Sequence, residues 1–258
     1  MTTDDPAPGH STSGAPTTHF GFRTVREDEK ASLVRDVFDS VAGKYDLMND
    51  LMSAGIHRLW KASFLDWLRP RPDQVLLDVG GGTGDIAFGW KARGGGPAMV
   101  CDINREMLAV GRDRSFDRNL IGQLGWVCGD AEALPVASGT VDRYTIAFCL
   151  RNVTHWENAI AEAFRVLRPG GRFMCLEFSH VVLPVLKQAY DVYSFNLLPR
   201  IGEMVTGNRE AYQYLVESIR RFPPQEELRA MIEAAGFERT EVRNLSGGIA
   251  AIHSGWKL

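Results

Sequence analysis

Short apolar runs alternate with helix-like periodicity through most of this chain. The first run, Val75–Val79, is continuous and ends at a glycine cluster, which is typical of a buried parallel strand. Four more strands are predicted at Ala98–Cys101, Leu124–Cys128, Val141–Phe148 and Arg172–Phe178. Because strands and helices alternate at this spacing, we expect an α/β fold with a mostly parallel sheet and helices on both faces.

Local signals predict several helix starts. Asn104 follows the second strand and is a suitable N-cap for the next helix. Thr154 and Glu157 have the spacing of a capping box, so a later helix is expected to open there. Pro223-Pro224 is expected to start a short helix. The last two runs, FERTEVRNL and IAAIHSGWKL, then predict a closing pair of strands.

One domain, residues 27–258, is expected to carry this alternation, because a chain of 258 residues can bury one substantial core. Residues 1–26 are rich in Pro, Ser, Thr and Gly and predict a disordered tail. Glu27–Ser40 has an apolar helical face and opens an N-terminal helical cap, residues 27–70. Residues 179–222 form a long insertion that is rich in aromatic and aliphatic side chains.

Composition and charge narrow the function classes. The net charge of -3 and pI near 6.1 argue against a nucleic-acid partner, which usually needs a basic excess. No apolar run approaches the ~20 residues that span a bilayer, and the N-terminus lacks a secretion signal, so a cytoplasmic protein is expected. The four cysteines and six histidines show no ligand spacing, so no metal site is predicted.

The glycine cluster after the first strand predicts a ligand-binding loop. Gly80, Gly82 and Gly84 let the backbone turn tightly and approach a ligand, and the next helix aims its N–H groups at the turn. A dinucleotide fingerprint, G-x-G-x-x-G, would need a third glycine where this chain has Asp85. That carboxylate would repel a pyrophosphate. It would tolerate S-adenosylmethionine (SAM), which carries a sulfonium and an ammonium and no phosphate.

Polar residues follow the predicted strand ends, where ligands bind in open α/β sheets. Asp102 is expected to accept both ribose hydroxyls of a nucleoside. Asp130 is expected to accept from an adenine amino group, beside the N–H of Ala131, and Thr83 can reach the methionine part of SAM. A helix cap explains any single Asp as well, but the combination with the glycine loop favours a nucleoside.

The pattern D-x-G-x-G-x-G, from Asp78 to Gly84, resembles the first motif of class I SAM-dependent methyltransferases. KYDLMNDLMSAGIHRLWK, DINREML, GDAEALP, FCLRNVT, RVLRPGG and YDVYSFNLLPRIG extend the likeness. They are similar to the ubiquinone/menaquinone biosynthesis C-methyltransferases, the UbiE family, from about Phe38 to the C-terminus. The resemblance implies a Rossmann-like sheet with an antiparallel C-terminal edge. It also implies an enzyme that methylates a ring carbon of a polyprenylated benzoquinol or naphthoquinol, with SAM as cofactor.

By position, the resemblance implies cofactor contacts for the glycine loop and for four residues, Thr83, Asp102, Asp130 and Ala131. Two departures from the family pattern matter. Many members have Asn-Ala where this chain has Asp130-Ala131, which keeps an acceptor and adds a charge. Many also have a serine at the position of Ala147, so a hydroxyl contact to the cofactor is expected to be lost here.

Methylation at a ring carbon needs the carbon and the methyl group in line at about 3–3.5 Å. Ionising a neighbouring phenol, whose pKa is ordinarily near 10, activates that carbon, and a fixed cation favours the ionised form. Arg151 is the candidate cation, and it cannot act as a base because it keeps its proton. Asn152 is expected to position the same edge of the substrate, and Tyr45 to help close the pocket. A salt bridge ahead of the next helix is the alternative role for Arg151.

The insertion at residues 179–222 is expected to cover the substrate side with an apolar groove for a polyprenyl tail. Ordinary core or a dimer surface explains the same residues. Because the substrate lies in a bilayer, transient contact with the inner face of the membrane is expected. A homodimer and a quinone-biosynthesis complex both stay open.

Three other functions stay open. One is a SAM-dependent methyltransferase for another small phenolic or lipid-like acceptor. Another is a SAM-binding subunit without turnover. A dinucleotide oxidoreductase is the third, and Asp85 disfavours it.

Overall fold

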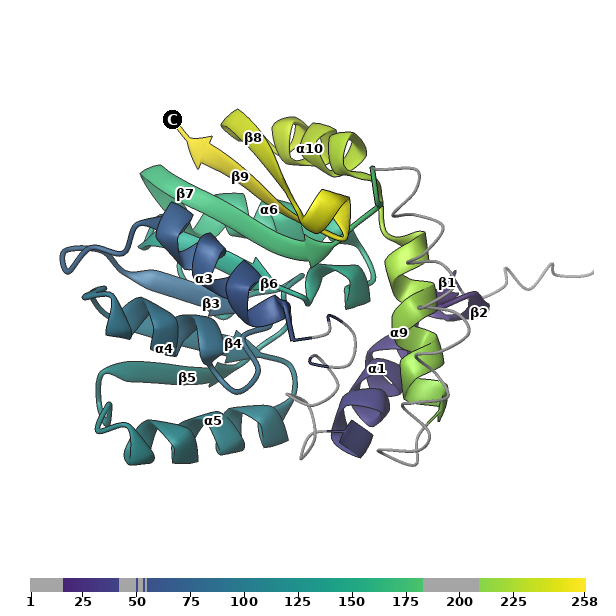
Figure 1. Cartoon of the computed structure of the whole chain (residues 1–258), viewed down its shortest axis with the longest axis horizontal. Coiled ribbons are helices and arrows are strands. Elements are labelled where there is room, and N and C mark those ends of the chain that lie inside the picture. Colours follow the sequence, from purple (N-terminus) through teal and green to yellow (C-terminus); the bar gives the residue numbers. More distant parts are fainter. Residues whose placement is uncertain (1–15, 42–49, 51–52, 54, 183–208) are drawn as a thin grey trace, which may run out of the picture.

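A seven-stranded sheet forms the centre of the molecule, with the strand order β5-β4-β3-β6-β7-β9-β8 (Figure 1). The structure is a computed structural model and describes residues 16–41, 50, 53, 55–182 and 209–258. The strands of the sheet are β3 (Leu76–Val79), β4 (Ala98–Asp102), β5 (Leu124–Cys128), β6 (Val141–Ala147), β7 (Leu167–Phe178), β8 (Glu238–Leu245) and β9 (Ala250–Lys257). All seven predicted strands are therefore present, although β7 begins at Leu167 rather than at the expected Arg172.

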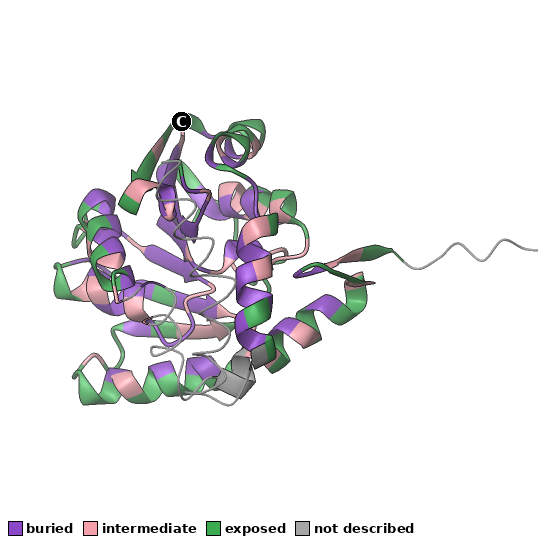
Figure 2. Cartoon of the chain, turned by 45° about the vertical axis from the view of Figure 1, so that its right-hand side comes forward, coloured by how far each residue is buried: buried purple, intermediate pink, exposed green. Residues whose placement is uncertain are grey.

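Helices cover both faces of this sheet because successive side chains of each strand point to opposite faces. Leu76 packs in a core cluster with α3, α4 and α9, whereas its neighbour Leu77 packs with α6 and α10. Figure 2 shows the buried strands between helices whose outer faces are exposed. The helices are α1 (Glu27–Val41), α3 (His57–Leu68), α4 (Asp85–Ala92), α5 (Arg105–Asp117), α6 (Trp156–Val166), α9 (Arg209–Arg221) and α10 (Gln225–Ala234). The expected α/β fold is confirmed.

The strand order reverses at β3. This strand pairs in parallel with β4 on one side and with β6 on the other. The chain leaves β3 toward β4 and β5 and later returns to β6, so the loops after β3, β4 and β6 diverge at one edge of the sheet. Such a reversal leaves a crevice beyond the carboxyl ends of the strands.

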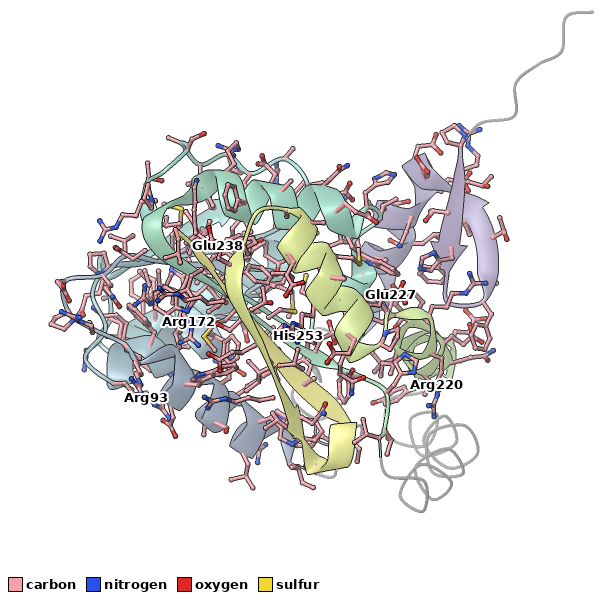
Figure 3. The ribbon with its side chains drawn as sticks, turned by 90° about the horizontal axis from the view of Figure 1, so that it is seen from above. Arg93, Arg172, Arg220, Glu227, Glu238 and His253 are labelled. Carbon is pink, nitrogen blue, oxygen red and sulfur yellow. The ribbon has the colours of Figure 1, made fainter. Side chains whose placement is uncertain are left out.

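The C-terminal strands form the expected antiparallel edge, because β9 pairs antiparallel with both β7 and β8. Arg172, labelled in Figure 3, anchors this edge from β7. Its guanidinium donates to the backbone oxygen of Trp67 at the end of α3 and to Ser254 Oγ on β9, both at 2.7 Å. Burial lowers the pKa of Arg172 to about 10, so the group stays charged near neutral pH. The edge is thus tied to the helix layer.

The prediction of a disordered tail over residues 1–26 is wrong for its last part, and residues 1–15 lie outside the described residues. A two-stranded antiparallel hairpin forms from β1 (Thr17–Phe20) and β2 (Arg23–Arg26). The Phe20 ring stacks on Tyr214 of α9 with centroids 4.1 Å apart. This contact supplies the apolar burial that the local composition lacks. Figure 1 shows the hairpin and α1 beside α9.

The predicted capping box at Thr154 and Glu157 is also wrong. Helix α6 begins at Trp156, and His155 stands at its N-cap without a side-chain bond to the helix. The carboxylate of Glu132 instead accepts from the amides of Thr154 at 3.0 Å and His155 at 3.1 Å. A residue from the loop after β5 therefore satisfies the donors that the sequence pattern assigned to a local cap.

Polar contacts attach α1 to the turn before α6. Lys30, which is 1% exposed, donates from Nζ to the backbone oxygen of Val153 at 2.9 Å. His155 lies between two carboxylates: its Nδ1 is 2.7 Å from Glu132 Oε2 and its Nε2 is 3.5 Å from Glu27 Oε2. The first helix is thus fixed against the carboxyl edge of the sheet.

We expect His155 to make this attachment pH-dependent. The hydrogen bond to Glu132 and the charge of Glu27 raise the pKa of His155 above its ordinary 6.5. Because the folded-state pKa is the higher one, the stabilisation is fully present below pH 6.5 and is lost as the pH rises through the raised value. Solvent screens this half-exposed pair, so the effect on stability is small.

The measurement is an NMR titration of the His155 ring. The midpoint should lie above 6.5 in the unaltered protein and move back toward 6.5 in Glu132→Gln. A midpoint at or below 6.5 in the unaltered protein would contradict the expectation.

Candidate active site

The glycine loop between β3 and α4 brings the backbone close to its neighbours. Gly80 and Gly82 have φ values of +61° and +53°, in the left-handed region that favours glycine. A Cβ on Gly80 would lie 2.1 Å from Cys149 Sγ, so only glycine lets the loop approach the end of β6. The amide of Gly82 donates to Asp102 Oδ2 at 2.8 Å. The loop is therefore fixed between the ends of β6 and β4.

Asp102, the last residue of β4, joins two turns through its carboxylate. One oxygen accepts from Gly82, and the other accepts from the amide of Asn104 at 2.8 Å. Asn104 in turn accepts from the amides of Glu106 and Met107 and caps α5, as predicted. Burial raises the pKa of Asp102, although its bonds to backbone amides oppose the rise. The two amide donors hold this carboxylate at the edge of the crevice.

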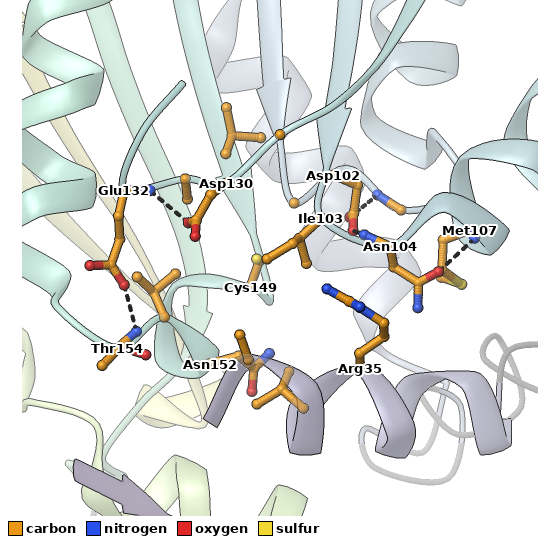
Figure 4. Close-up of a pocket in the computed structure, with 18 of the residues that line it drawn as sticks. Arg35, Asp102, Ile103, Asn104, Met107, Asp130, Glu132, Cys149, Asn152 and Thr154 are labelled. Carbon is orange, nitrogen blue, oxygen red and sulfur yellow. Dashed lines mark hydrogen bonds between the residues drawn. The ribbon is translucent and has the colours of Figure 1, made fainter. Parts of the chain in front are cut away.

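A cleft opens beyond the carboxyl ends of β3, β4, β5 and β6 (Figure 4). Ile103, Met107 and Phe148 give it apolar walls, and Asp102 and Asp130 give it two carboxylates from neighbouring strand ends. Helix α1 forms the remaining wall with residues at helical spacing, namely Ala31, Val34 and Arg35. The cleft thus combines apolar surfaces with acceptors of hydrogen bonds.

Asp130 and Ala131 both line this cleft, just after β5. The exposed Asp130 side chain accepts from the amide of Glu132 at 2.9 Å, while Ala131 is buried. The structure brings both residues to the same cavity as Asp102, as the sequence predicted. Their contacts with an adenine ring stay a prediction.

Thr83 and Gly84, the other predicted loop residues, do not line the main cleft. Thr83 faces a smaller cavity that shares Gly80 and Gly82 with the cleft, and its Oγ1 accepts from Arg114 Nη1 at 2.5 Å. At Gly84, a Cβ would meet the Trp126 ring at 2.7 Å. Gly84 therefore serves the packing of the helix start, and the main cleft is left to Gly80 and Gly82.

The turn after β6 sends its side chains in two directions. Phe148 has φ of +56°, which is uncommon for a residue with a side chain. Arg151, which is 3% exposed, donates from Nη1 to the Phe148 oxygen at 2.5 Å and to Glu177 Oε1 at 2.9 Å. Asn152 instead lines the cleft. The structure therefore brings Asn152 to the candidate site and places Arg151 in a buried ion pair, and a catalytic role for Arg151 stays a prediction.

Tyr45, the third predicted catalytic residue, lies outside the described residues. Tyr214 was not predicted, although it contacts the site directly: its hydroxyl donates to Asn152 Oδ1 at 3.0 Å from helix α9. Sequence reasoning grouped Tyr214 with the apolar insertion and assigned no partner to its hydroxyl. Arg35 and Glu132 also line the cleft without having been predicted. Ala31 and Arg35 are four residues apart and therefore lie on the same face of α1, and this spacing was the sequence signal that could have identified Arg35.

The fold and the cleft define a class I SAM-dependent methyltransferase. The glycine loop and the carboxylates of Asp102 and Asp130 suit the hydroxyl and amino donors of a nucleoside. Asp85 begins α4, at the position where a dinucleotide fingerprint needs its third glycine, and its carboxylate occupies that helix start together with its partners Lys61 at 2.8 Å and Arg114 at 3.0 Å. The residues present therefore fit SAM better than a dinucleotide.

Comparison with known proteins identifies the family. The model of the ubiE/COQ5 methyltransferase family matches residues 23–257, and the chain belongs to this family. A Roseobacter denitrificans protein named ubiquinone/menaquinone biosynthesis C-methyltransferase UbiE is 58% identical over 243 residues, which cover 94% of this chain and 97% of the relative. A Brucella abortus protein of the same name is 56% identical over 250 residues, covering 95% and 93%.

Solved structures agree on the fold. A SAM-dependent methyltransferase from Thermotoga maritima superimposes with a TM-score of 0.61 at 20% identity, covering 86% of this chain and 99% of that one. A second match comes from a complex between the Haloferax volcanii Trm112 methyltransferase activator and a methyltransferase. One chain of that complex superimposes with a TM-score of 0.62 at 16% identity, covering 85% of this chain and 97% of that one. At these identities the likeness concerns the fold.

We expect Gly80→Ala to disrupt cofactor binding, because its Cβ would meet Cys149 Sγ and force the loop to move. Gly94→Ala is the matched control, since Gly94 has a similar φ of +76° but open space around its Cβ position. A loop strain of about 1–3 kcal/mol corresponds to a loss of about 5- to 150-fold in affinity. Calorimetry with S-adenosylhomocysteine (SAH) should show such a loss for Gly80→Ala and unchanged affinity for Gly94→Ala. Equal affinities in the two variants would exclude this explanation.

Proposed function

We propose that this chain transfers a methyl group from SAM to a ring carbon of a polyprenylated benzoquinol or naphthoquinol in quinone biosynthesis. Membership of the ubiE/COQ5 family supports this, as do the names of relatives that are 56–58% identical over almost the whole chain. The observation that carries the site assignment is the position of Asn152. It lines the same cleft as Gly80 and Asp102, so an acceptor bound there lies beside the cofactor.

The chain's own residues must position the ring and exclude water. SAM supplies the methyl group on a sulfonium centre, which an electron-rich carbon can attack. Phe148 and Met107 offer apolar walls suited to an aromatic ring. The hydroxyl of Tyr214 donates to Asn152 Oδ1, which leaves the amide NH₂ of Asn152 as the donor for a ring oxygen. We therefore assign Asn152 to orienting the acceptor and Tyr214 to orienting Asn152.

In this proposal Arg151 does not contact the acceptor; it fixes the turn after β6, which carries Asn152. Its guanidinium lies behind the turn, where Glu177 balances its charge and the Phe148 oxygen accepts one of its bonds. The ion pair is almost fully buried, with side chains 3% and 1% exposed. Arg151 is thus a positioning residue that holds the backbone from which Asn152 projects.

Removing Arg151 alone cannot test this role, because it leaves the Glu177 carboxylate buried without its cation. Such a loss typically costs about 3–5 kcal/mol of stability. The double variant Arg151→Met/Glu177→Gln removes both charges and should recover most of that loss in thermal denaturation. We expect the double variant to bind SAH normally and to methylate tens of times more slowly, by about 2 kcal/mol in activation free energy. Near-normal turnover would remove Arg151 from the mechanism.

A polyprenyl tail needs an apolar surface near Asn152. Of the residues expected to form its groove, Tyr212, Tyr214 and Leu215 on α9 are buried in the core. The other predicted groove residues, between 183 and 208, lie outside the described residues. A search of the described helices finds none that is both long and apolar enough to cross a membrane. We propose that the acceptor is reached by transient contact with the membrane surface.

The function is tested by product analysis with labelled SAM. Demethylated quinols with and without the prenyl tail are supplied in detergent micelles, and the methylated carbon is located by mass spectrometry and NMR. We expect methylation at a ring carbon and a sharp rise in KM when the tail is removed. Methyl transfer to a tail-free phenol with equal efficiency would favour the alternative acceptor class. SAH binding without turnover of any quinol would favour a non-catalytic subunit.

A further inference from the structure

A second, smaller cavity adjoins the cofactor cleft at the glycine loop. It shares Gly80, Gly82 and Phe148 with the main cleft, so the two cavities meet along this backbone. Lys61 from α3 and Asp78 from β3 line it, so that both signs of charge face one small space. Nothing in the assignment of the nucleoside or of the acceptor uses these two side chains.

The chemistry of SAM calls for such a space. One half of the molecule is a nucleoside, and the other half, beyond the sulfur, is a free amino acid with an ammonium and a carboxylate. In the described residues, Arg35 is the cation that lines the main cleft, and it also lines a neighbouring hollow beside Asn104 and Asp130, at the nucleoside side (Figure 4). Lys61 is the cation that lines the smaller cavity.

We propose that Lys61 binds the α-carboxylate of the methionine part of SAM. Its Nζ now donates to Asp85 Oδ2 at 2.8 Å, and its side chain is 15% exposed. The other oxygen of Asp85 accepts from Arg114 Nη2 at 3.0 Å. Asp85 therefore keeps a cationic partner when Lys61 turns to the ligand, which makes the exchange less costly than breaking a solitary ion pair.

Asp78 supplies the opposite charge that a zwitterionic ligand needs. This residue is 0% exposed, and its Oδ1 accepts from Thr145 Oγ1 at 2.8 Å. Its Oδ2 has no hydrogen-bond partner within the described part of the chain. A Cβ on Gly81 would lie 2.8 Å from this oxygen, so only glycine leaves room beside it on the side of the loop. Burial raises the pKa of Asp78 to about 7, and an ammonium placed beside it would stabilise the charged form.

Ala147 faces the same cavity. Its methyl group offers no hydrogen bond, so the polar side chains that line the small cavity are Thr83, whose hydroxyl already accepts from Arg114, and the charged Lys61, Asp78 and Asp85. Lys61 is therefore the residue whose loss should weaken ligands that carry the amino acid and spare ligands that do not.

Two ligands separate this role from a general structural one. SAH carries the amino acid, and 5′-methylthioadenosine has the same nucleoside and sulfur without it. Lys61→Met removes the ammonium and keeps a good helix former. By calorimetry, the variant should bind SAH about 10- to 100-fold more weakly, the range for a charge-assisted hydrogen bond, and bind 5′-methylthioadenosine unchanged. Equal losses for both ligands, or no loss for either, would overturn the proposal.

Three control variants complete the test. Lys61→Arg keeps the charge and should retain most of the preference for SAH. Arg58→Met removes an exposed cation from the same helix and should change neither affinity. Asp85→Asn breaks the ion pair and leaves Lys61, so the preference for SAH should persist. If it falls there as far as in Lys61→Met, the ion pair explains the effect and the proposal fails.

Lys61→Gln replaces Lys61→Met if the latter does not fold, with the same expected split between the ligands. The proposal rests on SAM as the cofactor and not on the quinol acceptor. If the protein failed to methylate a quinol, the role proposed for Lys61 would therefore be unaffected. If Lys61→Met weakened both ligands equally, that role would be excluded and the assignment of the acceptor would be unaffected.

Discussion

The carboxylate of Asp102 is the constraint on which the cofactor side depends. A carboxylate that is partly removed from water is costly without hydrogen bonds, and the half-buried Asp102 accepts them from two backbone amides of separate turns. These bonds set the distance between the loop that begins α4 and the turn that begins α5. Gly80 extends the arrangement to β6 by packing on Cys149. The loops that follow β3, β4 and β6 are therefore held in fixed positions relative to one another before a ligand binds. This reduces the loss of conformational entropy on binding.

The N-terminal elements complete the cleft from outside the sheet and are tied to its acceptor side. Helix α1 supplies one wall, and its Lys30 reaches the Val153 oxygen directly after the turn that carries Asn152. Burial lowers the pKa of Lys30 to about 8, so this contact keeps its charge through most of the neutral range. Tyr214 joins α9 to the same turn. Both α1 and α9 are therefore attached to the turn that carries Asn152, so the position of this side chain depends on the elements outside the sheet.

The strand ends and the residues on them were predictable because their determinants are local. Apolar runs define the strands, the glycines follow directly, and Asn104 caps the helix whose first turn it precedes. The errors share a different cause. The hairpin depends on Phe20 packing against Tyr214, and the start of α6 depends on Glu132. In each case the deciding partner is distant in the sequence, so composition or a short motif could not identify it.

Two basic residues of this site illustrate why such roles require the fold. Arg151 and Lys61 each adjoin a predicted ligand loop, and each is paired with a carboxylate. Glu177 also accepts from the amide of Phe178, so the Arg151 pair is built into the backbone of β7 and maintains the unusual φ of Phe148. A buried pair of this kind adds little net stability, and its effect is on geometry. Asp85, in contrast, has a second cation, so Lys61 is the one of the two that can leave its partner. Both residues are cations, so charge does not distinguish their roles. Burial and the number of partners do: Arg151 fixes the backbone, and Lys61 binds the ligand in our proposal.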